Sequence, residues 1–298
     1  MAKQKIVIIV GPTASGKSAF AVALARKYNG EIVSADSRQV YRELNIGAGK
    51  ISKKEMLGIP HHLLDVASPK KKFSASDFVS LGKKALQNIS VCGKLPIIVG
   101  GTGYYIDALT CRIAVPNVEP NARLRTKLEK KSPAQLFAML QRKDSVRAKT
   151  IEPHHKRRLI RALEIIEALG HVPTPRLNLG TYDTLWIGIN PSRNSLDKKI
   201  TARLATRIQA GMIQEGQRLH TAGLSYKRMQ ELGLEYRALA RLLRKEITRE
   251  EFKKELFTDI RRYSKKQIAY WKRNHDIKWF STTDNRAIAS TVRIWLKK

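Results

Sequence analysis

The stretch IVIIVGPTASGKSAFAVAL, residues 6–24, decides the fold of this chain. At its centre two glycines are separated by four residues, and a lysine and a serine follow the second glycine, which is the spacing of a phosphate-binding P-loop. A β-branched apolar run precedes the loop and a helical pattern follows it, as the motif requires. The stretch predicts a bound di- or triphosphate, but it does not say whether that phosphate is transferred.

The loop offers an anion both backbone and side-chain charge. Glycines let the backbone turn its N–H groups toward the anion, and the start of the helix adds partial positive charge. Lys17 adds a full positive charge, and Ser18 is placed to bind Mg²⁺, the expected cofactor. The predicted diphosphate- or nucleotide-binding residues are Gly11, Pro12, Thr13, Ala14, Ser15, Gly16, Lys17 and Ser18.

Two further strand-like runs follow in the first third of the chain, EIVSADS at residues 31–37 and LPIIVGGTG at residues 95–103, with helical patterns between them. Strands that alternate with helices indicate a parallel sheet, and ligands of such sheets bind at the carboxyl ends of the strands. We therefore expect an α/β fold with a P-loop NTPase-like parallel sheet flanked by helices. The P-loop, Asp36 and Thr102 should meet at one edge of it.

The character of the sequence changes after residue 115. Short, basic helical patterns are followed by a proline-rich stretch, and the strand-like run TLWIGIN then resumes the sheet pattern. We interpret residues 116–182 as an inserted all-helical domain, and residues 1–115 and 183–298 as one discontinuous P-loop core.

The chain is strongly basic, with 57 Lys and Arg against 25 Asp and Glu and a net charge of +32. Such a field attracts polyanions, above all nucleic acid. Because the bias is spread along the chain, a generally basic proteome is an alternative cause. Residues 121–161 nevertheless hold thirteen basic side chains against three acidic ones, which favours a binding surface there.

Other features of the composition predict a cytoplasmic protein. No apolar run approaches the ~20 residues needed to cross a bilayer, so we expect no membrane contact. The N-terminus passes directly into a strand-like run and leaves no room for a signal peptide. Nothing in the sequence demands more than a monomer.

Asp36 ends a predicted strand, and two roles compete for it. A carboxylate at this place binds Mg²⁺ in many P-loop NTPases, and spacing alone favours that role. The alternative is a general base that faces an acceptor group. The residues that follow carry hydrogen-bonding and stacking groups suited to a nucleobase or another planar acceptor: Ser37, Arg38, Gln39 and Tyr41.

Further candidates lie later in the chain. Thr102 follows two glycines at a strand end, where its hydroxyl could bind phosphate or acceptor. In the predicted helix of residues 153–170, three arginines at helical spacing crowd one face: Arg157, Arg158 and Arg161. The alternative is a solvated face with Arg161 paired to Glu164. Nearer the C-terminus we expect Tyr263 and Trp271 to pack in the core.

With these motifs in place, the chain resembles the tRNA dimethylallyltransferase family over nearly its full length. The matching segments are GPTASGKS, EIVSADSRQVYRELNIGAGK, PHHLLDV, FSASDF, PIIVGGTGYY, PHHKRRLIRALEI and RRYSKKQIAYWKR. One departure is clear, because many members read Gly-Tyr-Lys/Arg where this chain reads LGLEYR. Glu235 stands in place of the glycine, which leaves the role of that loop and of Arg237 open.

The resemblance implies transfer of a dimethylallyl group from dimethylallyl diphosphate to the exocyclic amine of the adenine just 3′ of a tRNA anticodon. It assigns Asp36 as the base and Thr102 as a residue that helps fix the reactants. Lys17, the loop amides and Mg²⁺ on Ser18 would neutralise the leaving diphosphate. The inserted domain would grip the anticodon stem-loop. The expected tRNA-binding residues are Asp36, Ser37, Arg38, Gln39, Thr102, Arg125, Arg157, Arg158, Leu159, Ile160 and Arg161.

Three other functions share some of these features. A small-molecule kinase would use the same P-loop, but it has no use for the arginine helix. A non-catalytic RNA-binding ATPase would use both. An adenylate isopentenyltransferase would use the same prenyl donor on a free nucleotide and could dispense with the basic insertion.

Overall fold

The computed structural model describes residues 3–173 and 181–298. Its core is a six-stranded sheet. All strand pairs are parallel, and the order across the sheet is β3-β2-β4-β1-β5-β6. This confirms the predicted α/β fold. The strands are β1 (Gln4–Val10), β2 (Gly30–Ser34), β3 (His61–His62), β4 (Leu95–Val99), β5 (Tyr182–Ile189) and β6 (Lys278–Phe280).

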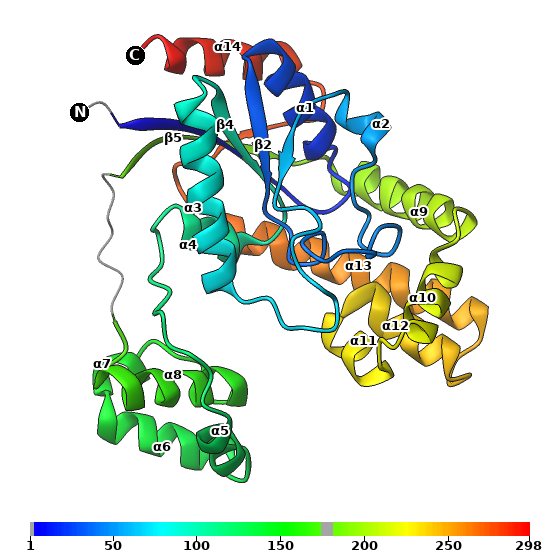
Figure 1. The fold of residues 1–298 in the computed structure, drawn as a ribbon. Helices are drawn as coiled ribbons and strands as arrows, with labels where there is room; N and C mark the ends of the chain where they lie inside the picture. Colours follow the sequence, from blue (N-terminus) through cyan, green and yellow to red (C-terminus); the bar gives the residue numbers. More distant parts are fainter. Residues whose placement is uncertain (1–2, 174–180) are drawn as a thin grey trace. The chain divides into compact units, whose positions relative to one another are not determined.

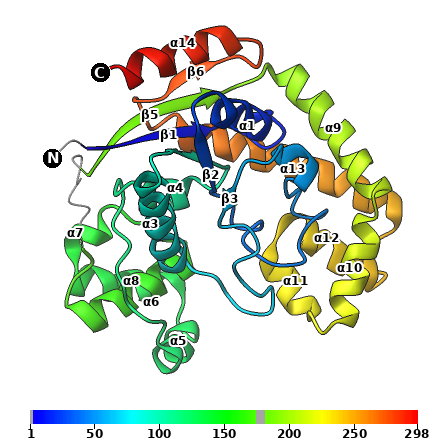
Figure 2. The same ribbon diagram turned by 45° about the horizontal axis from the view of Figure 1, so that its top comes forward.

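Helices cover both faces of the sheet, which is why its central strands are almost wholly apolar. On β1, Ile6 and Ile8 pack toward α3, α4 and α13, whereas Val7 and Ile9 pack toward α1 and α14 (Figure 1). The helices of this layered core are α1 (Lys17–Lys27), α3 (Ala75–Val91), α4 (Gly103–Leu109), α13 (Arg249–Trp271) and α14 (Asn285–Leu296). Figure 2 shows β6 and α14 closing the β5 side of the sheet.

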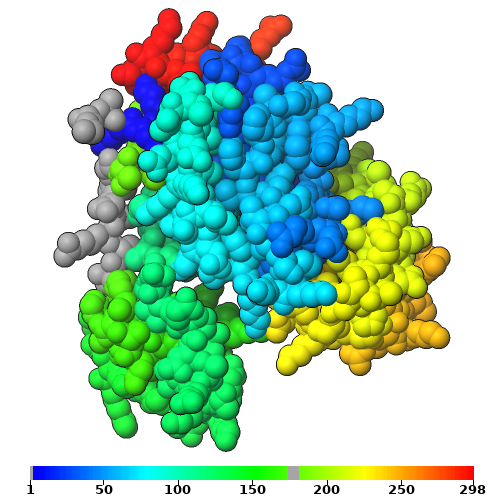
Figure 3. Space-filling model, viewed as in Figure 1, coloured from blue at the N-terminus to red at the C-terminus, as the bar shows by residue number. Residues whose placement is uncertain are grey.

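A second helical layer extends this core beyond the sheet. Its helices are α9 (Arg193–Gln209), α10 (Met212–Thr221), α11 (Tyr226–Leu232) and α12 (Leu234–Leu243), whereas the short α2 (Lys53–Met56) lies apart from them and buries none of its residues. The segment after β2 packs on them, because Val40, Tyr41 and Leu44 share one apolar cluster with residues of α9–α13. In the space-filling view these two parts of the chain form one continuous surface (Figure 3).

The chain divides into two compact units, Met1–Thr110 with Leu179–Lys298 and Cys111–Asn178. The sequence alone suggests boundaries after residues 115 and 182. The second unit holds α5 (Ala122–Glu129), α6 (Pro133–Lys143), α7 (Ser145–Ala148) and α8 (Lys156–Leu169), which share their own apolar core. Most of the proline-rich stretch predicted to link the units, residues 174–180, lies outside the described residues.

Helix ends follow from local sequence signals. A capping box at Ser74 begins α3, and another at Thr248 begins α13. Gly170 ends α8 in a left-handed conformation, as expected from its position. Within the described residues, no helix is long and apolar enough to cross a membrane.

Candidate active site

The P-loop connects β1 to α1 and depends on glycine for its shape. Gly11 has a φ of 151°, and a Cβ atom there would lie 2.4 Å from the carbonyl oxygen of Ile189. Gly16, with a φ of 88°, directly precedes α1. The loop can therefore present backbone N–H groups at a helix start, which is the geometry of an anion site.

Gln267 on α13 ties the P-loop to the end of β4. Its side-chain oxygen accepts the N–H of Thr13 at 2.8 Å, and its amide nitrogen donates to the carbonyl of Gly101 at 2.9 Å. Gln267 is buried. Gln267 of α13 thus links the loop after β1 to the loop after β4, which are distant in sequence.

Asp36 lies just beyond β2 with one carboxylate oxygen engaged and the other free. Its Oδ1 accepts the N–H groups of Arg38 at 2.8 Å and Gln39 at 3.3 Å, which closes a tight turn. Oδ2 accepts no hydrogen bond from any residue in the described ranges. The side chain is partly exposed at a cavity wall, so this oxygen can receive a proton from a bound molecule.

Thr102, at the same sheet edge as Asp36, helps to hold the turn that follows Asp36. Its hydroxyl accepts the N–H of Ser37 at 3.0 Å, and its own N–H donates to the carbonyl of Ala35 at 3.1 Å. Tyr263 on α13 lines the same cavities as Asp36. Burial and the nearby charge of Asp36 raise the pKa of Tyr263 to about 12, so its hydroxyl stays protonated near neutral pH.

Lys17, Arg203 and Arg207 line one small cavity with Ser18 and Asp36. Lys17 is partly exposed as a residue, but its ammonium group is enclosed and donates to the carbonyl of Pro12 at 3.0 Å. Burial, with a further contribution from Arg203, lowers the pKa of Lys17 to about 8, while Asp36 acts in the opposite direction. An incoming anion would relieve this crowding of positive charge.

Arg203 supplies charge that the protein itself does not neutralise. Burial and the like charge of Arg207 lower its pKa, yet the residue keeps exposed surface, as expected for a group on the wall of a pocket. No carboxylate of the described residues lies within 4 Å of it. Arg207, by contrast, forms a 3.0 Å ion pair with Glu235. The net charge around the cavity favours a di- or triphosphate.

A larger cavity of about 320 Å³ also borders Asp36. This volume is in the ~300–1,000 Å³ range of ligand pockets. Its walls include the Ser37–Arg38 turn, Arg237 and Tyr263. Asp36 lines both cavities and could act on a planar group held in the larger one while an anion occupies the smaller one.

The residues around the small cavity fit a Mg²⁺ ion that is held mainly by substrate phosphates and water, with few protein ligands. Among the described residues no group of three or more His, Cys, Asp or Glu could form a metal cage. Mg²⁺ is often bound by only one or two protein oxygens together with phosphates and water. The hydroxyl of Ser18 lines the small cavity beside Lys17 and can supply such an oxygen.

The arginine helix predicted in the insertion is α8, within the second unit. Arg157 and Arg158 are exposed and have no carboxylate within 4 Å in the part of the chain that the structure describes. Arg161 donates to Glu164 at 3.5 Å and to the carbonyl of Val118 at 2.8 Å. The free charge of this helix therefore belongs to its first turn.

Three further residues that were expected to contact tRNA, Arg125, Leu159 and Ile160, are engaged inside the unit. Arg125 forms two 2.7 Å hydrogen bonds with the buried carboxylate of Glu164. Burial alone would raise the pKa of Glu164, but Arg125 holds it below its usual value. Leu159 and Ile160 are 0% and 3% exposed, so their side chains belong to the apolar core and only their backbone could contact tRNA as expected.

Sequence reasoning missed several residues at the cavities: Arg203, Arg207, Tyr263 and Gln267. Tyr263 was expected in the core, yet only Trp271 is fully buried there. Gln267 could have been found in the sequence only as a polar residue on the largely apolar face of the helix that became α13. Glu235, the departure from the family pattern, pairs with Arg207 and lies on the cavity wall.

Comparison with known proteins identifies the family. A model described as IPP transferase matches residues 39–274. A tRNA dimethylallyltransferase of Anoxybacillus flavithermus is 37% identical over 95% of this chain and 92% of the relative. One from Bacillus cytotoxicus is 35% identical, covering 98% and 94%.

Solved structures agree with this result. The full-length tRNA isopentenylpyrophosphate transferase of Bacillus halodurans is 33% identical, with a TM-score of 0.73 and 99% of both chains covered. A eukaryotic dimethylallyltransferase acting on tRNA shares the fold at 23% identity, with a TM-score of 0.85 over 99% of this chain and 80% of that one. This chain therefore belongs to the tRNA dimethylallyltransferase family of IPP transferases.

Proposed function

We propose that this transferase prenylates tRNA by moving a dimethylallyl group from dimethylallyl diphosphate to the exocyclic amine of the adenine 3′-adjacent to the anticodon, with release of diphosphate. One observation carries the proposal beyond family membership. Asp36 lines two cavities, one rich in positive charge and one large enough for a planar group.

The amine nitrogen attacks the first carbon of the prenyl group. A nitrogen–carbon bond forms, the carbon–oxygen bond to diphosphate breaks, and its electron pair leaves with the diphosphate. The amine is a poor nucleophile because its lone pair is delocalised into the adenine ring. Oδ2 of Asp36 is free to take the proton that the nitrogen loses, a contribution of typically about 10²–10⁴ in rate.

The leaving diphosphate gains negative charge as the bond breaks. Lys17, Ser18 and Arg203 line the small cavity, so the charge develops next to donors that are already in position. Mg²⁺, when bound, adds further neutralising charge, and Ser18 would hold it. Thr102 and Tyr263 keep the Asp36 turn in place and help to exclude water from the carboxylate.

The acceptor must leave the stacked anticodon loop to reach Asp36, at a cost of about a few kcal/mol. We propose that Ser37 and Arg38, which line the larger cavity, hold the flipped base, that Gln39 supports them from the small cavity, and that Arg157 and Arg158 bind phosphates of the anticodon stem-loop. The exposed guanidinium groups in the first turn of α8 support this assignment. Arg161 is a weaker candidate, because it already has two partners.

The test is to incubate the protein with unmodified tRNA, Mg²⁺ and dimethylallyl diphosphate, then digest the tRNA and search for prenylated adenosine. We expect the product only with intact tRNA. Prenylation of free adenylate would favour an adenylate isopentenyltransferase. ATP hydrolysis or phosphoryl transfer without prenylation would refute the proposal in favour of an ATPase or kinase.

We further propose that the protein acts in the cytoplasm as a monomer. The groups to which we assign the reaction, Lys17, Asp36 and Arg203, line one cavity within a single chain, which supports this proposal. Light scattering after size exclusion should give the mass of a single chain, 33.7 kDa. A stable dimer would contradict the monomeric state but not the reaction.

A further inference from the structure

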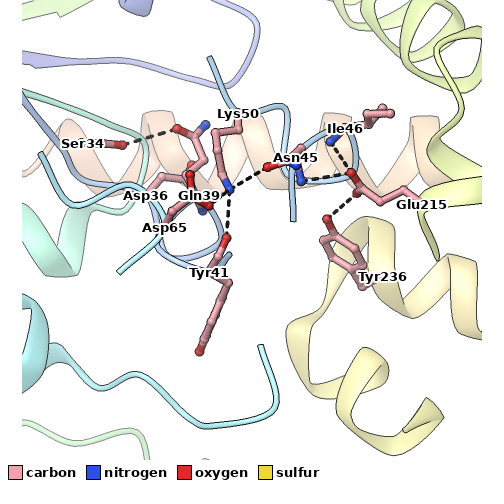
Figure 4. A network of polar contacts seen from close by, with 10 residues as sticks. All are labelled: Ser34, Asp36, Gln39, Tyr41, Asn45, Ile46, Lys50, Asp65, Glu215 and Tyr236. Carbon is pink, nitrogen blue, oxygen red and sulfur yellow. Dashed lines mark hydrogen bonds and ion pairs between the residues drawn. The ribbon is translucent and has the colours of Figure 1, made fainter. Parts of the chain in front are cut away.

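The loop of residues 45–49 is held by a buried carboxylate. Glu215, on α10, is 3% exposed. Its Oε2 accepts the N–H groups of Asn45 at 3.1 Å and Ile46 at 2.7 Å, and its Oε1 accepts that of Gly47 at 2.8 Å. Three successive amides on one carboxylate leave the loop little freedom; Figure 4 shows the contacts of Asn45 and Ile46 with Glu215.

Tyr236 completes the coordination of Glu215. Its hydroxyl donates to Oε1 at 2.9 Å, and burial with the neighbouring negative charge raises its pKa well above the usual value, so it remains a donor. The loop approaches this pair closely at Gly47. A Cβ atom there would lie 2.6 Å from the tyrosine oxygen and 3.0 Å from Oε1 of Glu215.

The carbonyl groups of the same loop face positive charge. Arg207 donates from Nε to the carbonyl of Ile46 at 2.7 Å and from its terminal nitrogen to that of Gly47. Arg203 donates to the carbonyl of Gly49 at 2.9 Å. Both arginines line the small cavity that holds Lys17 and Ser18.

The loop therefore connects a negative charge on α10 to positive charges on α9 through its own peptide groups. Amides point at Glu215 and carbonyls point at the guanidinium groups, so the peptide dipoles are favourably oriented toward both. Lys50 secures the far end of the loop, where it donates to the carbonyl of Tyr41 and the side chain of Asn45, each at 2.9 Å.

We propose that Glu215 is a positioning residue for the diphosphate site, because through the 45–49 loop it sets where Arg203 and Arg207 present their guanidinium groups. Glu215 does not line either cavity beside Asp36. The inference rests on the proposed function, since it assigns the small cavity to the diphosphate.

Glu215→Gln is the sharpest test, since it keeps the shape of the side chain but replaces an accepting oxygen with a donor that faces N–H groups. We expect the dissociation constant of inorganic diphosphate, measured calorimetrically with Mg²⁺ present, to rise about tenfold or more. The value of kcat/KM for dimethylallyl diphosphate should fall by a similar factor. The KM for tRNA should stay within about twofold.

Two further variants address the case in which Glu215→Gln fails to fold. Gly47→Ala should weaken diphosphate binding because the methyl group displaces the loop from Glu215. Tyr236→Phe removes one donor and leaves all three amides in place, so its effect should be smaller. Asp107→Asn is the matched control, because Asp107 is also buried and also accepts a tyrosine hydroxyl, that of Tyr270, at 2.5 Å.

The control separates positioning from general stability. If the Glu215 and Gly47 variants only lower the melting temperature, as Asp107→Asn is expected to do, and bind diphosphate like the parent protein, the inference is wrong. The diphosphate measurement needs no tRNA. A parent protein that binds diphosphate but does not prenylate tRNA would therefore overturn the proposed function and leave the role of Glu215 standing.

Discussion

The small cavity beside Asp36 and the first turn of α8 both gather arginines, but the protein treats their charge differently. At the cavity, backbone carbonyls and Glu235 hold Arg203 and Arg207 in defined positions. On α8, Arg157 and Arg158 extend into solvent with no carboxylate within 4 Å among the described residues. Each arrangement suits a different task.

Fixed cations stabilise charge at a single point, because no reorganisation is needed when the charge develops. Free cations on a surface can follow a flexible phosphate backbone, but salt screens them readily. The comparison predicts that changes at the cavity act on turnover and diphosphate binding, whereas changes on α8 act on tRNA affinity and its salt dependence.

The largest effect should come from Asp36→Asn. The amide oxygen can still accept the turn amides, but the group can no longer take a proton, so kcat should fall roughly 10²–10⁴-fold. Binding of tRNA, measured by filter retention, should hardly change. Asp77→Asn is the control, since Asp77 also accepts a backbone N–H, outside the cavities. If Asp36→Asn mainly loses affinity for Mg²⁺, Asp36 is a metal ligand instead.

Lys17→Ala should follow, with a decrease of about a hundredfold or more in kcat/KM, since it removes one preorganised charge from the leaving group. Steady-state kinetics with varied dimethylallyl diphosphate measure this decrease. The affinity of the variant for tRNA should remain that of the parent protein. An equal decrease in tRNA affinity would mean that the two regions do not divide their tasks as described.

The pH dependence of the reaction should identify the same lysine. With a pKa of about 8 in the free protein, Lys17 loses its proton as the pH rises through that value. An anion binds best to the protonated form, so kcat/KM for dimethylallyl diphosphate should decline above about pH 8. Lys17→Arg keeps its charge at high pH and should flatten that decline. An unchanged profile would assign the titration to another group.

Replacing Arg157 and Arg158 together by alanine should weaken tRNA binding and reduce its salt dependence. The slope of log affinity against log salt should decrease by about 0.7 to 0.9 for each phosphate that the variant no longer binds. Turnover at saturating tRNA should be unchanged. Arg142→Ala, an exposed arginine on α6, controls for removal of charge elsewhere in the unit. An equal effect from that control would argue for general attraction instead of a defined binding position.

Tyr263→Phe should have the smallest effect, a decrease in kcat of a few-fold. The hydroxyl lies near Thr102 and Asp36 but carries no charge, and the ring can still close the cavity wall. Rapid quench of a single turnover would detect the change. A decrease as large as that of Asp36→Asn would show that Tyr263 itself handles the proton.

The fold could be predicted well from the sequence because the motifs that specify it are each contained in a short stretch of residues. The P-loop spacing, the apolar runs at residues 6–10 and 95–99 and the cap at Gly170 each lie within a short window. The parallel sheet, its ligand edge and α8 follow from them. Strands β3 and β6 were missed because two- or three-residue edge strands have no periodicity to detect.

The site was predicted only in part. Lys17, Asp36 and Thr102 follow strands that end at one sheet edge, so topology brings them together. Arg203 comes from a helix with nothing in its sequence to distinguish it from other basic helices. In the same way, Leu159 and Ile160 looked available beside the arginines of α8 until packing showed them to be core residues.

The sequence by itself determined that the protein has a P-loop sheet, that its charge suits a polyanion and that Asp36 lies at the same sheet edge as the P-loop. Only the tertiary structure decided which cations are free to act, since that depends on partners far away in the chain. Glu164 neutralises Arg125 across 39 positions, and Glu215 reaches the 45–49 loop across about 170. Such pairings are set by packing, which brings together residues that no local pattern connects.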